Sequence, residues 1–161
     1  MKGLSVVLAL CLLSGVAHAR AVVSLPVARS ITPDCVMDAA LAHDVPLAAL
    51  LGILATEGGK TGEAQRNANG TFDLGPFQVN TCNLNELVAQ GFSPEAILLD
   101  GCINARAAAW ILRREYARSG DLWTAIGSYH SRTPKYRDAY IARVRKHLAR
   151  MGSGLWPDGQ P

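Results

Sequence analysis

The sequence PLAALLGILATEGGKTGEAQRNANGTFDLGPFQVN, residues 46–80, joins an apolar helix to a polar segment rich in glycine and asparagine. Four leucines in its first half follow one helix face with the spacing i, i+3, i+4, i+7. These are Leu47, Leu50, Leu51 and Leu54. The next turn of that face carries Glu57, and the following Gly58 and Gly59 predict the end of the helix. The stretch therefore predicts a carboxyl group at the last turn of a buried helix.

Glu57 is predicted to keep its proton near neutral pH. Desolvation on an apolar face disfavours the charged carboxylate. The last helical turn also carries the negative end of the helix dipole, which disfavours a second negative charge. Both effects raise the pKa, and a carboxyl group that is protonated near neutral pH can act as a general acid. The simpler alternative is a solvated Glu beyond the apolar face, which is the commoner case at helix ends.

The N-terminus reads as a secretory signal peptide over residues 1–19. One lysine precedes an apolar run at residues 4–13, and AHA at 17–19 is a typical cleavage site. The run is too short to span a membrane. Cys11 follows Leu10 rather than a small residue, so we expect no lipid anchor and a periplasmic protein. Cleavage would remove 19 of the 161 residues and leave 142, the size of one domain.

Charge and cysteine content exclude several classes of function. Loss of Lys2 leaves 15 basic against 13 acidic side chains, a balance too mild to indicate nucleic-acid binding. Cys35, Cys82 and Cys102 would meet an oxidising compartment, which allows one disulfide and one free thiol. No cluster has zinc-ligand spacing, so we expect no metal and no cofactor.

Composition and capping signals predict one mainly helical domain over residues 33–151. An extended lead-in at 20–32 and a disordered tail at 152–161 flank it. Cap residues and apolar periodicity predict the helices. They cover about 33–43, 46–57, 83–91, a turn or two from Ser93, 102–118, 122–128 and 134–151. Asn69-Gly70 predicts a tight hairpin turn flanked by 71–72 and 77–79, which is the only strand structure expected.

Six segments in order resemble one known family. They are EGG (57–59), NANG (67–70), DLGPFQVN (73–80), DGCIN with AWIL (100–112), WTAIGSYH (123–130), and TP with YIARV (133–144). Together they resemble the lysozyme-like lytic transglycosylase (SLT-type) domain over about residues 33–148. The resemblance is to the small specialised enzymes that accompany conjugation, pilus and type III or IV secretion machines. It implies a mainly α (α+β lysozyme-like) fold, a single helical domain with one small β-hairpin beside the active-site cleft.

The resemblance also implies an activity. Such an enzyme cuts the β-1,4 bond between N-acetylmuramic acid and N-acetylglucosamine in peptidoglycan glycan strands, and locally opens the wall for its apparatus. Glu57 would protonate the bridging oxygen. As a base, it would then take the proton of the muramoyl 6-hydroxyl, which closes a 1,6-anhydro ring. The expected partners are glycan strands and components of a secretion, pilus or conjugation machine, without a stable membrane anchor.

Asp73 leaves the type of reaction open. Residues 69–75 also look like the hairpin of animal-type lysozymes, which places an ionised aspartate opposite the acid. Asp73 would then stabilise the transition state or act as nucleophile in a hydrolytic muramidase. A structural alternative is that Asp73 only binds backbone amides of the turn. A third possibility is a non-catalytic wall-binding protein that has kept the cleft.

The resemblance assigns four further site residues. Gln78 and Asn80 match amides that line the sugar cleft, although bonds within the hairpin are the alternative for both. Tyr129 and Tyr140 match tyrosines near the acid, where a phenol can orient the carboxyl group or stack on a sugar. Tyr140 also lies on an apolar stripe, so packing explains it nearly as well. His130 stands where the family usually has Asn, and no role is assigned to it.

The resemblance pairs Cys35 with Cys102, which would tie the first helix to the helix after the hairpin. A Cys82–Cys102 bond, as in animal-type lysozymes, is the rival. The expected last helix is strongly basic, which usually means a solvated face. The alternative is that it faces anionic peptides of the wall or a partner. The residues are Arg132, Lys135, Arg137, Arg143, Arg145, Lys146 and Arg150.

Overall fold

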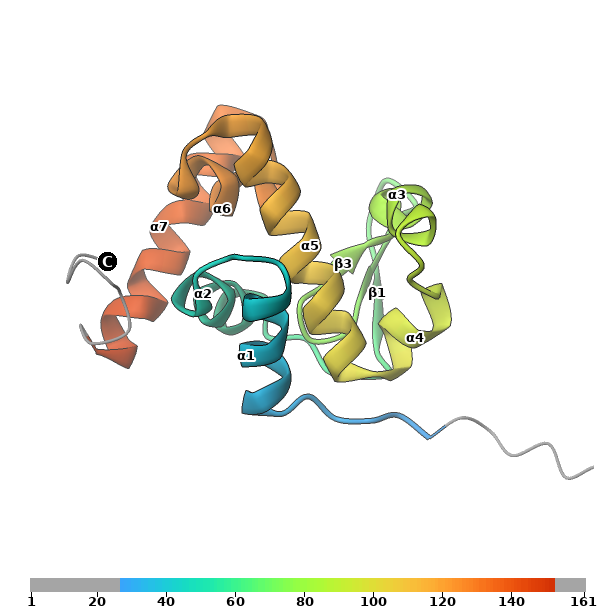
Figure 1. The fold of residues 1–161 in the computed structure, drawn as a ribbon. Helices are drawn as coiled ribbons and strands as arrows, with labels where there is room; N and C mark the ends of the chain where they lie inside the picture. The colour runs from blue at the N-terminus through green and yellow to red at the C-terminus, as the bar shows by residue number, and fades with distance from the viewer. Residues whose placement is uncertain (1–26, 153–161) are drawn as a thin grey trace, which may run out of the picture.

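The computed structural model describes residues 27–152, in which a small three-stranded sheet lies at one side of a group of helices (Figure 1). The first elements are α1 (Pro33–Ala42), α2 (Leu47–Glu57), β1 (Ala64–Arg66), β2 (Phe72–Leu74), β3 (Val79–Asn80) and the 3-10 turn η1 (Thr81–Asn83). Then follow α3 (Leu84–Ala89), α4 (Pro94–Leu99), α5 (Gly101–Ser119), α6 (Leu122–His130) and α7 (Pro134–Met151). The mainly helical class is confirmed. The predicted signal peptide, the lead-in up to residue 26 and the tail from residue 153 lie outside the described residues.

Helix starts follow the capping residues that the sequence offers. The Thr32 hydroxyl accepts the Cys35 N–H at the start of α1, and the Ser93 hydroxyl accepts the Ala96 N–H at the start of α4. Asp100 accepts two backbone N–H groups at the start of α5. The α2 helix ends at Gly58, whose φ of 61° is the left-handed conformation that glycine adopts without strain. This end fixes the position of Glu57.

The sheet differs from the single hairpin that was expected. Its strands run antiparallel in the order β1-β2-β3, so β1 was missed and the third strand begins only at Val79. All three residues of β1 are exposed, so they carry no alternating apolar pattern. Gly75 and Gln78 have φ of 66° and 49°, which turns the chain at Phe77 and Gln78 where a strand was predicted.

The α5 helix is the centre of the molecule. It contacts α1, α4, α6 and β3. Figure 1 shows it between a group of helices formed by α1, α2, α6 and α7 and a smaller part that holds the sheet, α3 and α4. A buried Asn104 on α5 joins the two parts, because its amide donates to the carbonyls of Leu74 and Ile97 and accepts the Phe77 N–H. The sheet is therefore fixed to the helical core.

The buried face of α2 is displaced from the predicted leucine stripe. Leu50 is fully buried, as expected, but Leu47, Leu51 and Leu54 are only half-buried. The helix packs against both α1 and α7, so its buried face is centred on the small residues beside Leu50. At Gly52 a Cβ would lie only 2.8 Å from Val144 Cγ1 and 3.0 Å from Leu148 Cγ on α7. The missing side chain lets α7 approach α2.

The disulfide joins Cys35 on α1 to Cys102 on α5, so the pairing that the resemblance implied is confirmed and the rival Cys82–Cys102 bond is wrong. Cys82 is a free, exposed thiol. Across residues 27–152, we find no helix with both the length and the apolar character needed to cross a bilayer.

Candidate active site

A cleft of about 1060 Å³ runs between the sheet and the helices α5 and α6. Five of the six predicted catalytic and sugar-binding residues line it, namely Glu57, Asp73, Gln78, Asn80 and Tyr129. The sixth, Tyr140, is fully buried and contacts Glu57. Residues from α2, the sheet, α6 and α7 thus meet at one place.

Glu57 is a protonatable carboxyl group at neutral pH. Burial is the largest influence and, together with the negative charge of Asp73, raises its pKa to about 7. The hydrogen bond from Tyr140 and the positive charge of Arg143 act in the opposite direction, but they do not offset burial. The carboxyl group is therefore poised to give and take a proton close to pH 7.

Tyr140 orients this carboxyl group. Its hydroxyl donates to Glu57 Oε1 over 2.6 Å. The His130 ring stacks on the Tyr140 ring, with centroids 4.9 Å apart and 6° between the planes. The Arg143 guanidinium lies 5.2 Å from the same ring centroid. Tyr140 is thus packed in place, and His130, which had no assigned role, contributes to that packing.

Asp73 projects from β2 into the same cleft and is held by two side-chain amides. Asn67 Nδ2 donates to Oδ2 over 2.9 Å and Asn80 Nδ2 donates to Oδ1 over 2.7 Å. The Thr71 hydroxyl accepts from the same two amides. Within the described chain the carboxylate binds these side chains rather than the backbone amides of the turn. The cleft thus contains a half-buried, desolvated carboxyl group at Glu57 and, at Asp73, a carboxyl group that two side-chain amides hold.

The two hairpin amides behave differently. Gln78 donates from Nε2 to the Gly75 carbonyl, and its amide oxygen has no partner among residues 27–152. Asn80 uses its whole amide within the protein, because its oxygen also accepts the Cys82 N–H. Gly59 matters here because a Cβ at that position would collide with the Gly75 carbonyl and the Gln78 amide. Gln78 therefore offers an acceptor to the cleft, whereas Asn80 holds Asp73.

Tyr129 joins α6 to the turn that carries Gln78. Its hydroxyl donates to the Phe77 carbonyl over 2.8 Å. Burial raises the pKa of this phenol, and the negative charges of Glu57 and Asp73 raise it further. The hydroxyl therefore stays protonated and fixes one wall of the cleft to the other.

Comparison with known proteins identifies the family of this chain. The family described as "Transglycosylase SLT domain" matches residues 34–146. The chain belongs to the SLT transglycosylase family. It is also 31% identical over 119 residues to "Invasion protein IagB" of Salmonella typhimurium and of Salmonella typhi. The match covers 73% of this chain and 71% of IagB.

Membership defines the general class of this SLT domain. It is a lytic-transglycosylase-type enzyme domain, and peptidoglycan is the substrate that the family implies. The mainly helical structure with a small antiparallel sheet fits the lysozyme-like fold of the family.

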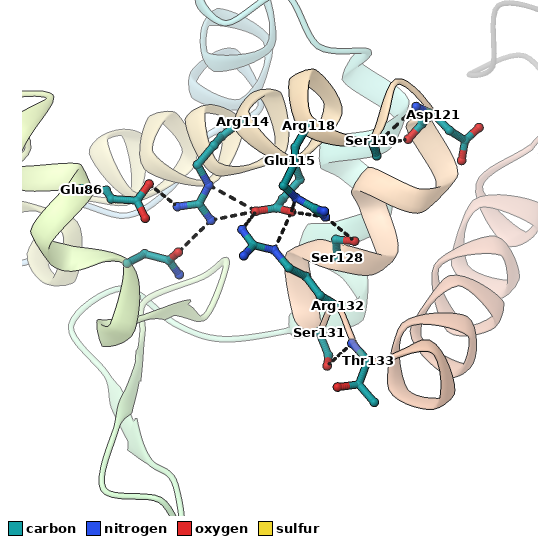
Figure 2. A network of polar contacts seen from close by, with 11 residues as sticks. Glu86, Arg114, Glu115, Arg118, Ser119, Asp121, Ser128, Ser131, Arg132 and Thr133 are labelled. Carbon is teal, nitrogen blue, oxygen red and sulfur yellow. Dashed lines mark hydrogen bonds and ion pairs between the residues drawn. The ribbon is translucent and has the colours of Figure 1, made fainter.

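One part of the cleft of this SLT domain, around Glu115, was not predicted from the sequence. Glu115 on α5 is only 1% exposed and lies between Arg114, Arg118 and Arg132, as Figure 2 shows. Ala108, Ile111 and Glu115 follow the same apolar spacing that singled out Glu57, so a signal existed. Asn67 was part of the resemblance, but its bond to Asp73 depends on the sheet register.

Proposed function

We propose that this SLT domain is a peptidoglycan lytic transglycosylase with Glu57 as its general acid and base. It cleaves the β-1,4 bond between N-acetylmuramic acid and N-acetylglucosamine. The observation that carries the proposal is a cleft carboxyl group with a pKa of about 7 that a buried tyrosine orients. Gln78 lines the same cleft and supplies a free amide oxygen for sugar hydroxyl or acetamido groups.

The hydrogen bond from Tyr140 supports different roles for the two oxygens of Glu57. Tyr140 donates to Oε1, so Oε2 carries the proton toward the substrate. In the first step this proton goes to the bridging oxygen as its bond to the muramoyl C1 breaks. In the second step the Glu57 carboxylate takes the proton of the muramoyl 6-hydroxyl, whose oxygen bonds to C1. A 1,6-anhydro ring forms and Glu57 regains its proton.

Asp73 supports a second candidate, a hydrolytic muramidase. Its carboxylate, held by Asn67 and Asn80, shares the cleft with Glu57 and raises the pKa of that group. An ionised aspartate so placed can stabilise the oxocarbenium-like transition state while water attacks C1. Mass spectrometry of the soluble muropeptides separates the two candidates. Anhydro-muramic ends indicate the transglycosylase, whereas reducing ends indicate hydrolysis.

Two substitutions test the roles of the carboxyl groups. Glu57→Gln keeps the shape but cannot donate the proton, so we expect cleavage of purified sacculi to fall by about 10²–10⁴-fold. Asp73→Asn removes a stabilising charge and one of the two acceptors for Asn67 and Asn80 but leaves Glu57 in place, so we expect a loss of about tenfold, or about 1.4 kcal/mol. Unfolding temperatures serve as the folding control.

The outcomes separate the possible functions. Near-native activity of Glu57→Gln would disprove its role, and a loss for Asp73→Asn as large as for Glu57→Gln would favour the muramidase. A wild-type chain that binds sacculi without releasing soluble fragments would be a wall-binding protein.

We further propose that the enzyme acts in the periplasm and opens the wall locally for a secretion, pilus or conjugation apparatus. The apolar N-terminal run with its AHA site supports export. The similarity to IagB, which is named as an invasion protein, supports a role alongside such an apparatus. We expect cell fractionation to recover the protein in the periplasm, and mass spectrometry to show that the mature chain begins at Arg20.

A further inference from the structure

The cleft contains a second polar region that the proposed chemistry does not use. We call it the arginine end, and it consists of Asn83, Glu86, Arg114, Glu115 and Arg132. The charges that act on Glu57 are those of Asp73 and Arg143, and neither Arg114 nor Arg132 is among them; Arg114, Arg132 and Asp73 all act on Cys82. The arginine end therefore lies away from Glu57, on the side of the cleft where Cys82 and Asp73 are found.

Glu115 holds the arginines in place. Its Oε1 accepts from Arg132 Nη2 over 2.7 Å and from Arg114 Nη2 over 3.1 Å. Its Oε2 accepts from Arg118 Nε over 2.9 Å and from Arg132 Nε over 3.1 Å. Burial alone would raise the pKa of Glu115, but the hydrogen bonds from Arg132 and Arg118 hold it below its usual value. The residue is a buried, charged anchor (Figure 2).

The arginine cluster retains a positive charge after these pairings. Glu115 balances one of the three guanidinium groups, and the exposed Glu86 balances another through its 2.9 Å contact with Arg114. Arg132 binds Glu115 through Nε and Nη2 alone, and its Nη1 has no partner among the residues described. The Arg132 side chain is 58% exposed and lines the cleft. One edge of a fixed guanidinium is thus open to a ligand.

We propose that Arg132 binds a carboxylate of the peptide stems that peptidoglycan carries on its muramic acid. A guanidinium edge with two N–H groups matches a carboxylate in a bidentate geometry. The sugars of the strand are uncharged, so the carboxylates of the peptide stem are the groups with which a guanidinium can form an ion pair. Glu115 is the positioning residue, and Arg114 adds a second charge nearby. The inference rests on the proposed function, because it requires glycan strands in this cleft.

The test compares two forms of the same glycan strands. One keeps its free stem carboxylates, and in the other a carbodiimide and ammonia have converted them to amides. We expect wild type to have a lower KM for the free-carboxylate strands. Arg132→Gln should raise that KM about tenfold with kcat unchanged, because a charge-assisted hydrogen bond away from Glu57 is lost. On amidated strands the variant should match wild type.

Control variants separate this site from general charge and folding. Arg106→Gln removes the same charge from an exposed position of α5 and should change neither KM. Arg132→Lys keeps the positive charge but loses the paired N–H groups of the guanidinium. Its KM for free-carboxylate strands should therefore lie between those of wild type and Arg132→Gln. Unfolding temperatures show whether Glu115 tolerates the loss of one partner.

Each failure has its own meaning. An equal loss for Arg132→Gln on both strands, or no preference of wild type for free carboxylates, would overturn the stem-binding role while the cleavage chemistry stands. Absence of soluble products from either strand with wild type would instead overturn the proposed function.

Discussion

The pKa of Glu57 is set by opposing influences from residues that are distant in the sequence. Leucine periodicity and the following glycines predicted a desolvated carboxyl group at residue 57, and the glycines do end α2 there, although the buried face of the helix is displaced from the leucine stripe. Tyr140, Asp73 and Arg143 reach Glu57 from α7 and β2, and the strength of those contacts depends on packing. The sequence therefore predicts the acid and the direction of its pKa shift. It does not predict which side chains hold the charged residues of the cleft, such as the two amides on Asp73.

The Tyr140 hydroxyl lowers the pKa of Glu57, because its hydrogen bond stabilises the carboxylate. For wild type we expect kcat/KM to fall above about pH 7, where the acid loses its proton. Tyr140→Phe removes the hydrogen bond, so the pKa rises and this alkaline limb moves to higher pH. A pH profile of both proteins is the measurement. A limb that stays in place or moves to lower pH would exclude the assigned role of Tyr140.

At the level of elements, helices were predicted better than strands. Proline and Asp, Ser or Thr caps mark the helix starts within one or two residues. The exposed β1 strand has no apolar alternation, and the left-handed residue Gln78 delays the start of the third strand to Val79. The arginine end was missed for another reason. Glu115 and Arg132 lie 17 residues apart and meet only because α6 packs on α5.

Asn104 is the element-scale contact that places the sheet on α5. Asn104→Ala would leave the Phe77 N–H and the carbonyls of Leu74 and Ile97 buried without that partner. We expect a loss of about 3 kcal/mol in the free energy of unfolding, measured in urea. Asn69→Ala is the matched control, since among residues 27–152 this exposed amide bonds to Thr71 alone, and its loss should change stability little. Equal effects would mean that Asn104 does not fix the sheet.

For the whole molecule, the Cys35–Cys102 bond closes a loop that contains the predicted catalytic acid. The two cysteines are 67 residues apart in the sequence. Replacing both with Ala should lower the free energy of unfolding by about 4 kcal/mol, because the unfolded chain regains its loop entropy. Cys82→Ser should leave stability nearly unchanged. Denaturant curves of the oxidised proteins test this, and equal curves for wild type and the double variant would contradict it.

The tight contact at Gly52 has a practical consequence for anyone engineering this protein. Replacing a helical glycine with alanine is a common way to make a protein more stable, with a gain of about 1 kcal/mol in the free energy of unfolding. Here an added methyl group would push against Val144 and Leu148 on the helix that carries Tyr140. A shift of α7 would lengthen the hydrogen bond between Tyr140 and Glu57, which are 83 residues apart in the sequence. We therefore expect Gly52→Ala to lower the stability of the protein and to raise the pKa of Glu57, the proposed acid, by weakening its bond to Tyr140.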